Sequence, residues 1–176
     1  GYGLTVEKKA QTSPSDTKKK TGTNNFITAY IDHGASPQNA SYEYLMLVKP
    51  NSKEEGKYSK KLPYTVLQAD NSAHVVNDEI TGITAYISYK GYASDKTLLA
   101  QAEPETIVME RTKDDGDVVI SICTPDLGIT QKGYTTTQPS QVTVKKIVLN
   151  GIWTLSDPCD DVNISSSGSN TVIEVS

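Results

Sequence analysis

The chain has 176 residues and a formal net charge of −4, with 36% hydrophobic and 22% charged residues. This length fits one β-sandwich domain, or one small domain plus part of another, and is sufficient for a buried core. Nucleic-acid-binding proteins are typically basic, so the acidic balance disfavours nucleic acid as a partner. No apolar stretch is long enough to span a bilayer, so we expect no membrane partner.

Most periodic segments alternate with a period of two residues, which is typical of half-buried strands. Tyr, Val, Ile and Thr are frequent, and these residues suit a pleated surface. Short strands separated by turn signals predict an all-β fold, an antiparallel β-sandwich. The predicted strands are 3–10, 26–33, 41–49, 64–68, 74–78, 83–89, 106–111, 117–123, 141–150, 152–155 and 171–175.

Turns and helices follow from the residues between these strands. The sequence Lys-Asp-Asp-Gly at 113–116 predicts a hairpin, and Asn150-Gly151 predicts another between the strands on either side of it. Helix is limited to a weak prediction at 53–60, which Gly56 interrupts, and one or two turns at 94–102 after a Ser94 cap.

The polar segments 12–25 and 165–170 contain almost nothing to bury, so we expect mobile loops there. A charged stretch near residues 51–63 predicts a boundary between the end of one sheet system, residues 1–62, and a C-terminal sandwich, residues 63–176. The chain starts directly in a strand-like run without a signal peptide, so we expect it to be a piece of a longer protein.

Two cysteines, Cys123 and Cys159, are too few for a disulfide framework. We expect two buried or half-buried thiols, with one bridge as the alternative in an oxidising compartment.

Few residues suit acid–base catalysis. The chain has one arginine, Arg111, and two histidines, His33 and His74. Neighbouring strand residues point to opposite faces, so Asp32 and His33 are poorly placed as a dyad, and a loop-stabilising hydrogen bond is favoured. For His74 we favour a half-buried or surface position over a catalytic role.

Aromatic residues have two interpretations. Trp153 is a core anchor or an exposed sugar platform, and we favour the anchor. A set of tyrosines could form a sugar-stacking surface, although packing within the sheets is favoured. These are Tyr42, Tyr44, Tyr86, Tyr89 and Tyr92.

Charged clusters also have two interpretations. The loop containing Asp157, Asp160, Asp161 and Asn163 lacks EF-hand spacing, so a solvated acidic turn is favoured over Ca²⁺ binding. Three lysines at 18–20 could attract a polyanion, but in a polar loop they are more often simply solvated. We therefore expect no metal and no cofactor.

Several segments, in order along the chain, resemble the C-terminal region of bacterial chondroitin and hyaluronan lyases, with the greatest likeness to the chondroitin sulfate ABC lyases. They are YIDHG and NASYEYLML within 30–48, TVLQADNSAHVVNDEITGITAYISY at 65–89, PETIVMERTKDDGDVVISICTPDLGI at 104–129, and VTVKKIVLNGIW at 142–153. The resemblance covers nearly the whole chain except 12–25.

The resemblance implies a periplasmic or secreted bacterial lyase in which an α-helical toroid carries most of the catalytic site and β-sandwich domains follow. No residue here matches the family's catalytic motifs, so we assign no catalytic residue, and the carbohydrate-binding residues are unknown. The implied function is a non-catalytic portion that braces the upstream domains of a lyase acting on chondroitin or dermatan sulfate, with hyaluronan as a further substrate. The alternatives are a module that binds glycosaminoglycan and, from the sandwich pattern alone, an Ig-like surface module.

Overall fold

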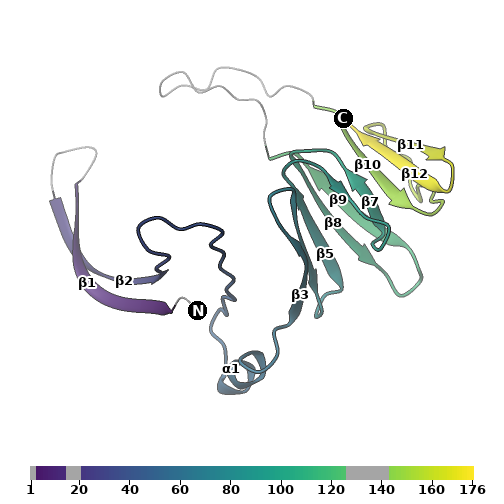
Figure 1. Cartoon of the computed structure of the whole chain (residues 1–176). Helices are drawn as coiled ribbons and strands as arrows, with labels where there is room; N and C mark the ends of the chain where they lie inside the picture. The colour runs from purple at the N-terminus through teal and green to yellow at the C-terminus, as the bar shows by residue number, and fades with distance from the viewer. Residues whose placement is uncertain (1–2, 15–20, 126–142) are drawn as a thin grey trace. The chain divides into compact units, whose positions relative to one another are not determined.

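The computed structural model describes residues 3–14, 21–125 and 143–176 (Figure 1). The chain divides into two compact units, Gly1–Pro50 and Asn51–Ser176. The boundary predicted between residues 62 and 63 stays a prediction. Among the described residues, no helix combines the length and apolar character that crossing a membrane requires.

The first unit contains a two-stranded antiparallel hairpin. Strands β1 (Leu4–Pro14) and β2 (Thr21–Ile31) pair in register from Leu4 opposite Ile31 to Pro14 opposite Thr21. Both predicted strands are confirmed, but each extends into the segment 12–25 that we expected to be a loop. Cross-strand hydrogen bonds between polar side chains, such as Thr12 Oγ1 to Thr23 Oγ1 at 2.9 Å, support this longer pairing.

The strand predicted at 41–49 is wrong. These residues are irregular, and no strand in the described part of the chain pairs with them. Positive φ angles at Asn39 (53°) and Lys49 (49°) bound the segment. Its alternating apolar residues gave a strand-like pattern, but alternation forms a strand only where a partner supplies the hydrogen bonds.

The second unit begins with helix α1 (Ser52–Tyr58), which is shorter than the predicted 53–60. Asn51 caps it, because its Oδ1 accepts from the backbone N–H groups of Lys53 and Glu54, each at 3.0 Å. The Glu54 carboxylate accepts from the Asn51 N–H in return, at 3.0 Å, which completes a capping box. This cap explains why the helix forms despite Gly56.

The described residues after α1 form two five-stranded antiparallel sheets and their connections, and the predicted fold class is confirmed (Figure 1). We call them the first sheet, in the order β3-β4-β5-β8-β9, and the second sheet, in the order β11-β12-β10-β7-β6. The first sheet contains β3 (Tyr64–Ala69), β4 (Ala73–Asp78), β5 (Ile83–Ser88), β8 (Thr106–Thr112) and β9 (Val118–Cys123). The second contains β6 (Tyr92–Ala93), β7 (Leu99–Ala102), β10 (Lys145–Asn150), β11 (Val162–Ser167) and β12 (Asn170–Val175).

The first sheet follows the sequence-based prediction closely. The hairpin predicted at 113–116 joins β8 to β9: the Lys113 N–H donates to the Asp117 carbonyl at 2.8 Å. Gly116 has a φ of 91°, a conformation that residues with a Cβ rarely adopt.

The second sheet accounts for most of the corrections. The helix predicted at 94–102 is wrong, because this segment contains β7, which lies between β6 and β10. The hairpin predicted at Asn150-Gly151 is also wrong: β10 pairs with β7 and β12, and residues 152–155 form no strand. The predicted loop 165–170 instead contains the end of β11, a tight turn and the start of β12. In the first two corrections the strand pairing joins β7 to β10, which lie more than forty positions apart in the sequence.

Side chains from both sheets form one core between them. Tyr86, Val75 and Val108 from the first sheet are buried, as are Leu99, Ile147 and Leu149 from the second. The rings of Tyr86 and Tyr92 meet edge to face across the sheets, with centroids 5.1 Å apart and planes at 63°.

A polar pair lies inside this core. The Tyr86 hydroxyl donates to Glu110 Oε1 at 2.6 Å, and Glu110 is only 8% exposed. Burial raises the pKa of the Glu110 carboxyl, and hydrogen bonds from Tyr86 and from the Leu99 backbone N–H oppose this rise without cancelling it. Burial, followed by the neighbouring Glu110, also raises the pKa of Tyr86.

The core predicts a large contrast between two leucines. Leu99→Ala removes a fully buried side chain and is expected to cost about 2–5 kcal/mol of unfolding free energy. Leu67→Ala is the matched control, because Leu67 is 50% exposed, and it is expected to cost less than about 1 kcal/mol. Urea unfolding followed by circular dichroism measures both values. Equal costs would contradict the assignment of the core.

The buried carboxyl predicts a pH-dependent contrast. A pKa raised in the folded state gives a contribution to stability that is fully present below the unfolded pKa and is lost as pH rises through the folded pKa. Glu110→Gln keeps an oxygen that can accept from Tyr86 but cannot ionise. We therefore expect this variant to gain stability relative to the wild type as pH rises from about 4 to about 8.

Urea midpoints of the two proteins at each pH test this expectation. The surface carboxyls of Asp70, Asp78 and Glu79 have lowered pKa values and act in the opposite direction, but they are common to both proteins and cancel in the difference. A difference that does not change with pH would refute this account of Glu110.

Candidate functional site

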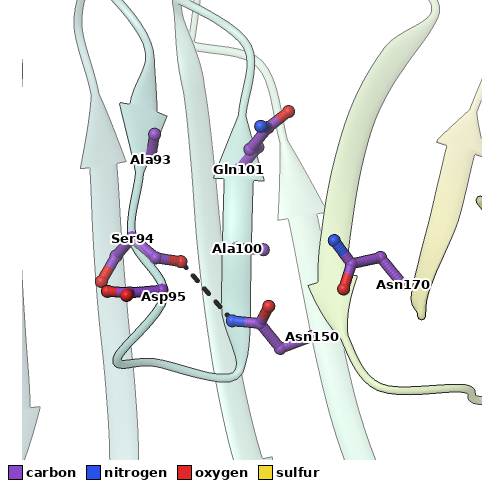
Figure 2. Close-up of a pocket in the computed structure, with 7 residues that line it drawn as sticks. All are labelled: Ala93, Ser94, Asp95, Ala100, Gln101, Asn150 and Asn170. Carbon is purple, nitrogen blue, oxygen red and sulfur yellow. Dashed lines mark hydrogen bonds between the residues drawn. The ribbon is translucent and has the colours of Figure 1, made fainter. Parts of the chain in front are cut away.

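An open hollow of about 390 Å³ lies on the outer face of the second sheet. Tyr92, Leu149 and Thr171 point into the core, so the strand residues beside them, which include Ala93, Asn150 and Asn170, point outward. Figure 2 shows the side chains that line the hollow: Ala93, Ser94, Asp95, Ala100, Gln101, Asn150 and Asn170.

A β-bulge shapes the floor of this hollow. Val148 pairs with Gln101 and Leu149 pairs with Leu99, so Ala100 is an extra residue in β7. The small side chains of Ala93 and Ala100 leave the space open between the polar groups at its rim.

Asn150 holds one wall in place. Its side-chain Nδ2 donates to the Thr97 carbonyl at 2.7 Å and to the Ser94 carbonyl at 3.5 Å, which ties β10 to the loop between β6 and β7 (Figure 2). Gln101 and Asp95 are exposed and Asn170 is half-buried at the rim. The hollow therefore presents amides, a hydroxyl and one carboxylate, groups that suit hydrogen bonding to a neutral polar ligand such as a sugar.

The lining does not suit acid–base chemistry on a uronic acid. Elimination at a uronate needs donors that neutralise its carboxylate, a base for the C5 proton and an acid for the leaving oxygen. The residues that line the hollow include no Arg, Lys, His or Tyr, and their one charged group, Asp95, would repel an anionic ligand.

The conventional catalytic residues do not gather here. Arg111 and His74 are exposed on the first sheet, where Arg111 pairs with Ile83 and Val119, and His74 pairs with Ile87. The His74 ring contacts Tyr89 edge to face, with centroids 5.3 Å apart, in agreement with the surface position favoured from the sequence.

Asp32 has the local role predicted for it. Its Oδ1 accepts from the Gly34 backbone N–H at 2.7 Å, and Gly34 has a φ of 80°. His33 is half-buried, with its ring centroid 6.3 Å from that of Tyr42.

The tyrosines do not form a single sugar-stacking surface. Tyr86 and Tyr92 are buried in the core, as favoured from the sequence. Tyr42 and Tyr44 stack on one another in the first unit, with centroids 6.2 Å apart, and remain 68% and 69% exposed. The packing interpretation therefore holds for the buried pair alone.

Trp153 is a core anchor, as favoured. It packs against the core cluster, and its indole N–H donates to the Asn150 carbonyl at 2.8 Å. Gly151 makes this possible, because a Cβ there would lie 3.3 Å from the indole nitrogen.

Charged and sulfur-containing residues complete the candidates. The described residues contain no group of three or more His, Cys, Asp or Glu placed to hold a metal ion, the acidic loop near Asp157 included. Cys123 and Cys159 are free and exposed, which corrects the expectation of buried thiols: Cys123 lies on the outer side of β9, and Cys159 lies in a loop. Lys18–Lys20 lie outside the described residues.

Sequence reasoning missed the hollow itself. Ser94 was interpreted as a helix cap and Asn150 as a hairpin residue. The available signal was the asparagines at the end of β10 and the start of β12, Asn150 and Asn170, but only the strand pairing shows that they lie opposite one another on one face with Gln101.

No family model matches the chain. It is similar to chondroitin sulfate ABC endolyase of Proteus vulgaris, with 29% identity over 174 residues, which cover 96% of this chain and 16% of that protein. It is also similar to chondroitin sulfate ABC exolyase of the same species, with 32% identity over 170 residues, 84% of this chain and 16% of the relative. The exolyase of Bacteroides thetaiotaomicron is 32% identical over 116 residues, 65% of this chain and 11% of the relative.

Solved structures share the fold. Streptomyces coelicolor chondroitin AC lyase matches 98% of this chain and 22% of its own, with a TM-score of 0.67 and 17% identity. Paenibacillus xanthan lyase matches 98% of this chain and 16% of its own, with a TM-score of 0.71 and 20% identity. The chain thus spans between a tenth and a quarter of the lyases that it matches, and the expected resemblance to chondroitin sulfate ABC lyases is confirmed.

Proposed function

We propose, from its homology to one segment of the chondroitin sulfate ABC lyases, that this chain is the non-catalytic C-terminal β-sandwich portion of a glycosaminoglycan lyase. The observation that carries the proposal is the disparity in coverage: nearly the whole chain aligns, yet it accounts for 16% of the endolyase. The parent enzyme would cleave chondroitin or dermatan sulfate, and hyaluronan as a further substrate, by β-elimination.

The chemistry of the described residues supports a non-catalytic role. A tyrosine that acts as a base needs an accessible hydroxyl with a pKa near or below its usual value. Tyr86, the tyrosine with the most perturbed environment, is buried, and its pKa is raised by burial. Arg111 lies on the first sheet, and the hollow on the second sheet contains no cation to neutralise a uronate.

The architecture supports a bracing role. The second unit has its own core of large apolar side chains and so can act as a rigid body. A rigid sandwich joined to a catalytic domain would hold that domain's substrate groove in a fixed shape, which long polymeric substrates require. We further propose a periplasmic or secreted location, because glycosaminoglycans are extracellular polymers.

A binding function is the second candidate, and the hollow favours it. Gln101, Asn170 and Asp95 line it without an intramolecular hydrogen bond from their side chains in the described structure, so they are available to a ligand. The lack of cations suits the hydroxyl and acetamido groups of a sugar better than its sulfates. The Ig-like surface module has only the generic sandwich pattern in its favour.

The main proposal predicts that the isolated chain does not cleave chondroitin sulfate. The assay follows the ultraviolet absorbance of the unsaturated uronate that elimination produces. We expect no absorbance change above the blank, whereas a full-length chondroitin lyase at the same molar concentration turns over readily. Turnover that scales with the concentration of the purified chain would refute the non-catalytic role.

The second candidate predicts a specific mutational response. Titration of the chain with chondroitin oligosaccharides should shift the side-chain amide NMR signals of Gln101 and Asn170, and Asn170→Ala should weaken binding about tenfold through the loss of one or two hydrogen bonds. Ser165→Ala, on the same face but outside the hollow, is the control. An affinity of millimolar or weaker leaves only the bracing role.

A further inference from the structure

We propose that the outer face of the first sheet is a docking surface for another domain of the same lyase polypeptide. This inference rests on the proposed function and adds to it by naming the surface through which bracing acts. We call the surface the outer apolar face. It consists of Val66, Val76, Ala85, Ile87, Ile107 and Met109.

Strand register makes this face continuous. Val66 lies opposite Val76, Val76 opposite Ala85, and Ala85 opposite Met109, so one apolar row crosses four adjacent strands. Ile87 opposite Ile107 forms part of the next row on the same face. Directly paired side chains are about 4.5–5.5 Å apart at Cβ, so the rows form one contiguous patch.

These side chains remain open to solvent in this chain. Val66 is 38% exposed, Ile87 36% and Met109 43%. Their neighbours in β5 and β8, such as Tyr86 and Val108, already fill the core on the other side. The centre of this sheet is therefore apolar on its outer side as well as on its core side, with His74 and Arg111 at the border of the outer patch, a pattern that suits cover on both sides.

The second sheet provides an internal comparison. Its outward positions pair Asn163 with Glu174, Glu174 with Lys146, and Ser165 with Val172. That face is mostly polar, as expected for an antiparallel sheet with one face in water. The apolar character of the first sheet's outer face is thus a property of that face and not of this sandwich in general.

The chemistry of the face identifies its occupant. Aliphatic side chains and Met offer no donor to a sulfated, carboxylated polysaccharide, so they favour an apolar protein surface over the substrate. The matched region makes up 16% of the endolyase, so the homologous enzymes have a much larger protein mass in the same polypeptide. A covalently linked partner is present at high effective concentration, which favours it over a second copy of the chain.

A native thiol provides the test. Cys123 pairs with Ile107 at the edge of the outer apolar face and is exposed, whereas Cys159 lies in a loop away from it. Maleimide labelling, with mass spectrometry of the resulting peptides, gives the rate at each thiol in the 176-residue chain and in the full-length lyase that contains it. We expect Cys123 to react about tenfold or more slowly in the full-length enzyme. Equal rates for Cys123 in the two proteins would overturn the proposal.

A second probe lies at the centre of the face. In a Met109→Cys variant with Cys123→Ser, the new thiol should also react with maleimide more slowly in the full-length enzyme than in the 176-residue chain. Equal rates at this position would likewise overturn the proposal. Met109→Lys should lower the unfolding temperature of the full-length enzyme while leaving that of the 176-residue chain nearly unchanged. Ser165→Lys, on the outer face of the second sheet, should change neither.

Sedimentation velocity distinguishes a domain of the same polypeptide from a second copy of the chain as the occupant of this face. If the full-length enzyme is a dimer that Met109→Lys dissociates, the face binds a second copy and the intramolecular proposal is wrong. Failure of the proposed function has a different signature: turnover of chondroitin sulfate by the isolated chain would refute the non-catalytic role without altering the protection of Cys123.

Discussion

The contact between Tyr86 and Tyr92 joins the two sheets, and the rest of the sandwich is arranged around it. Each ring comes from a different sheet, and the hydroxyls are both satisfied inside: Tyr86 donates to Glu110, and Tyr92 lies 2.7 Å from Thr97 Oγ1. Burying two phenols and a carboxyl costs free energy, and these hydrogen bonds offset part of that cost. Since the inner faces are fully committed to this core, any ligand or partner of the second unit must use an outer face or an edge.

The two outer faces then differ in chemistry. On the second sheet, amides surround small alanines in an open hollow, and Asn150 fixes its wall. On the first sheet, an aliphatic row crosses four strands. Homology to lyases several times longer than this chain fits the proposed division of roles, in which the second sheet's outer face would meet solvent and small polar ligands and the first sheet's outer face would meet protein. Among the residues that the structure describes, neither face has the convergent cations and bases that elimination at a uronate requires.

Sequence patterns predicted most of the first sheet, where consecutive strands pair through short turns and the Asp-Gly hairpin leaves little freedom. They failed in the second sheet for a physical reason. The strand β7 has four residues and gains its hydrogen bonds from β10, more than forty positions later, so its own composition, Leu-Ala-Gln-Ala, suggested helix. The strand prediction for residues 41–49 was wrong for the opposite reason. Apolar and polar side chains alternate there as in a strand, but no partner strand is present among the described residues. The roles of Asp32 and Trp153 were predictable because each depends on a local turn. The hollow was not predictable from the sequence, because its lining residues come from four separate segments of the chain.

The order of the strands also governs how this unit reaches its native state. In chain order, β3, β4 and β5 belong to the first sheet, β6 and β7 to the second, β8 and β9 to the first again, and β10, β11 and β12 to the second. Neither sheet can be completed before the chain has passed between them, so loop-closure entropy must be overcome several times before the non-local pairings stabilise the product. Folds dominated by such non-local pairings fold slowly. During synthesis, a nascent chain that ends between β7 and β9 has two unfinished sheets with open edges, which is the interval when a chaperone or a neighbouring domain has most to protect.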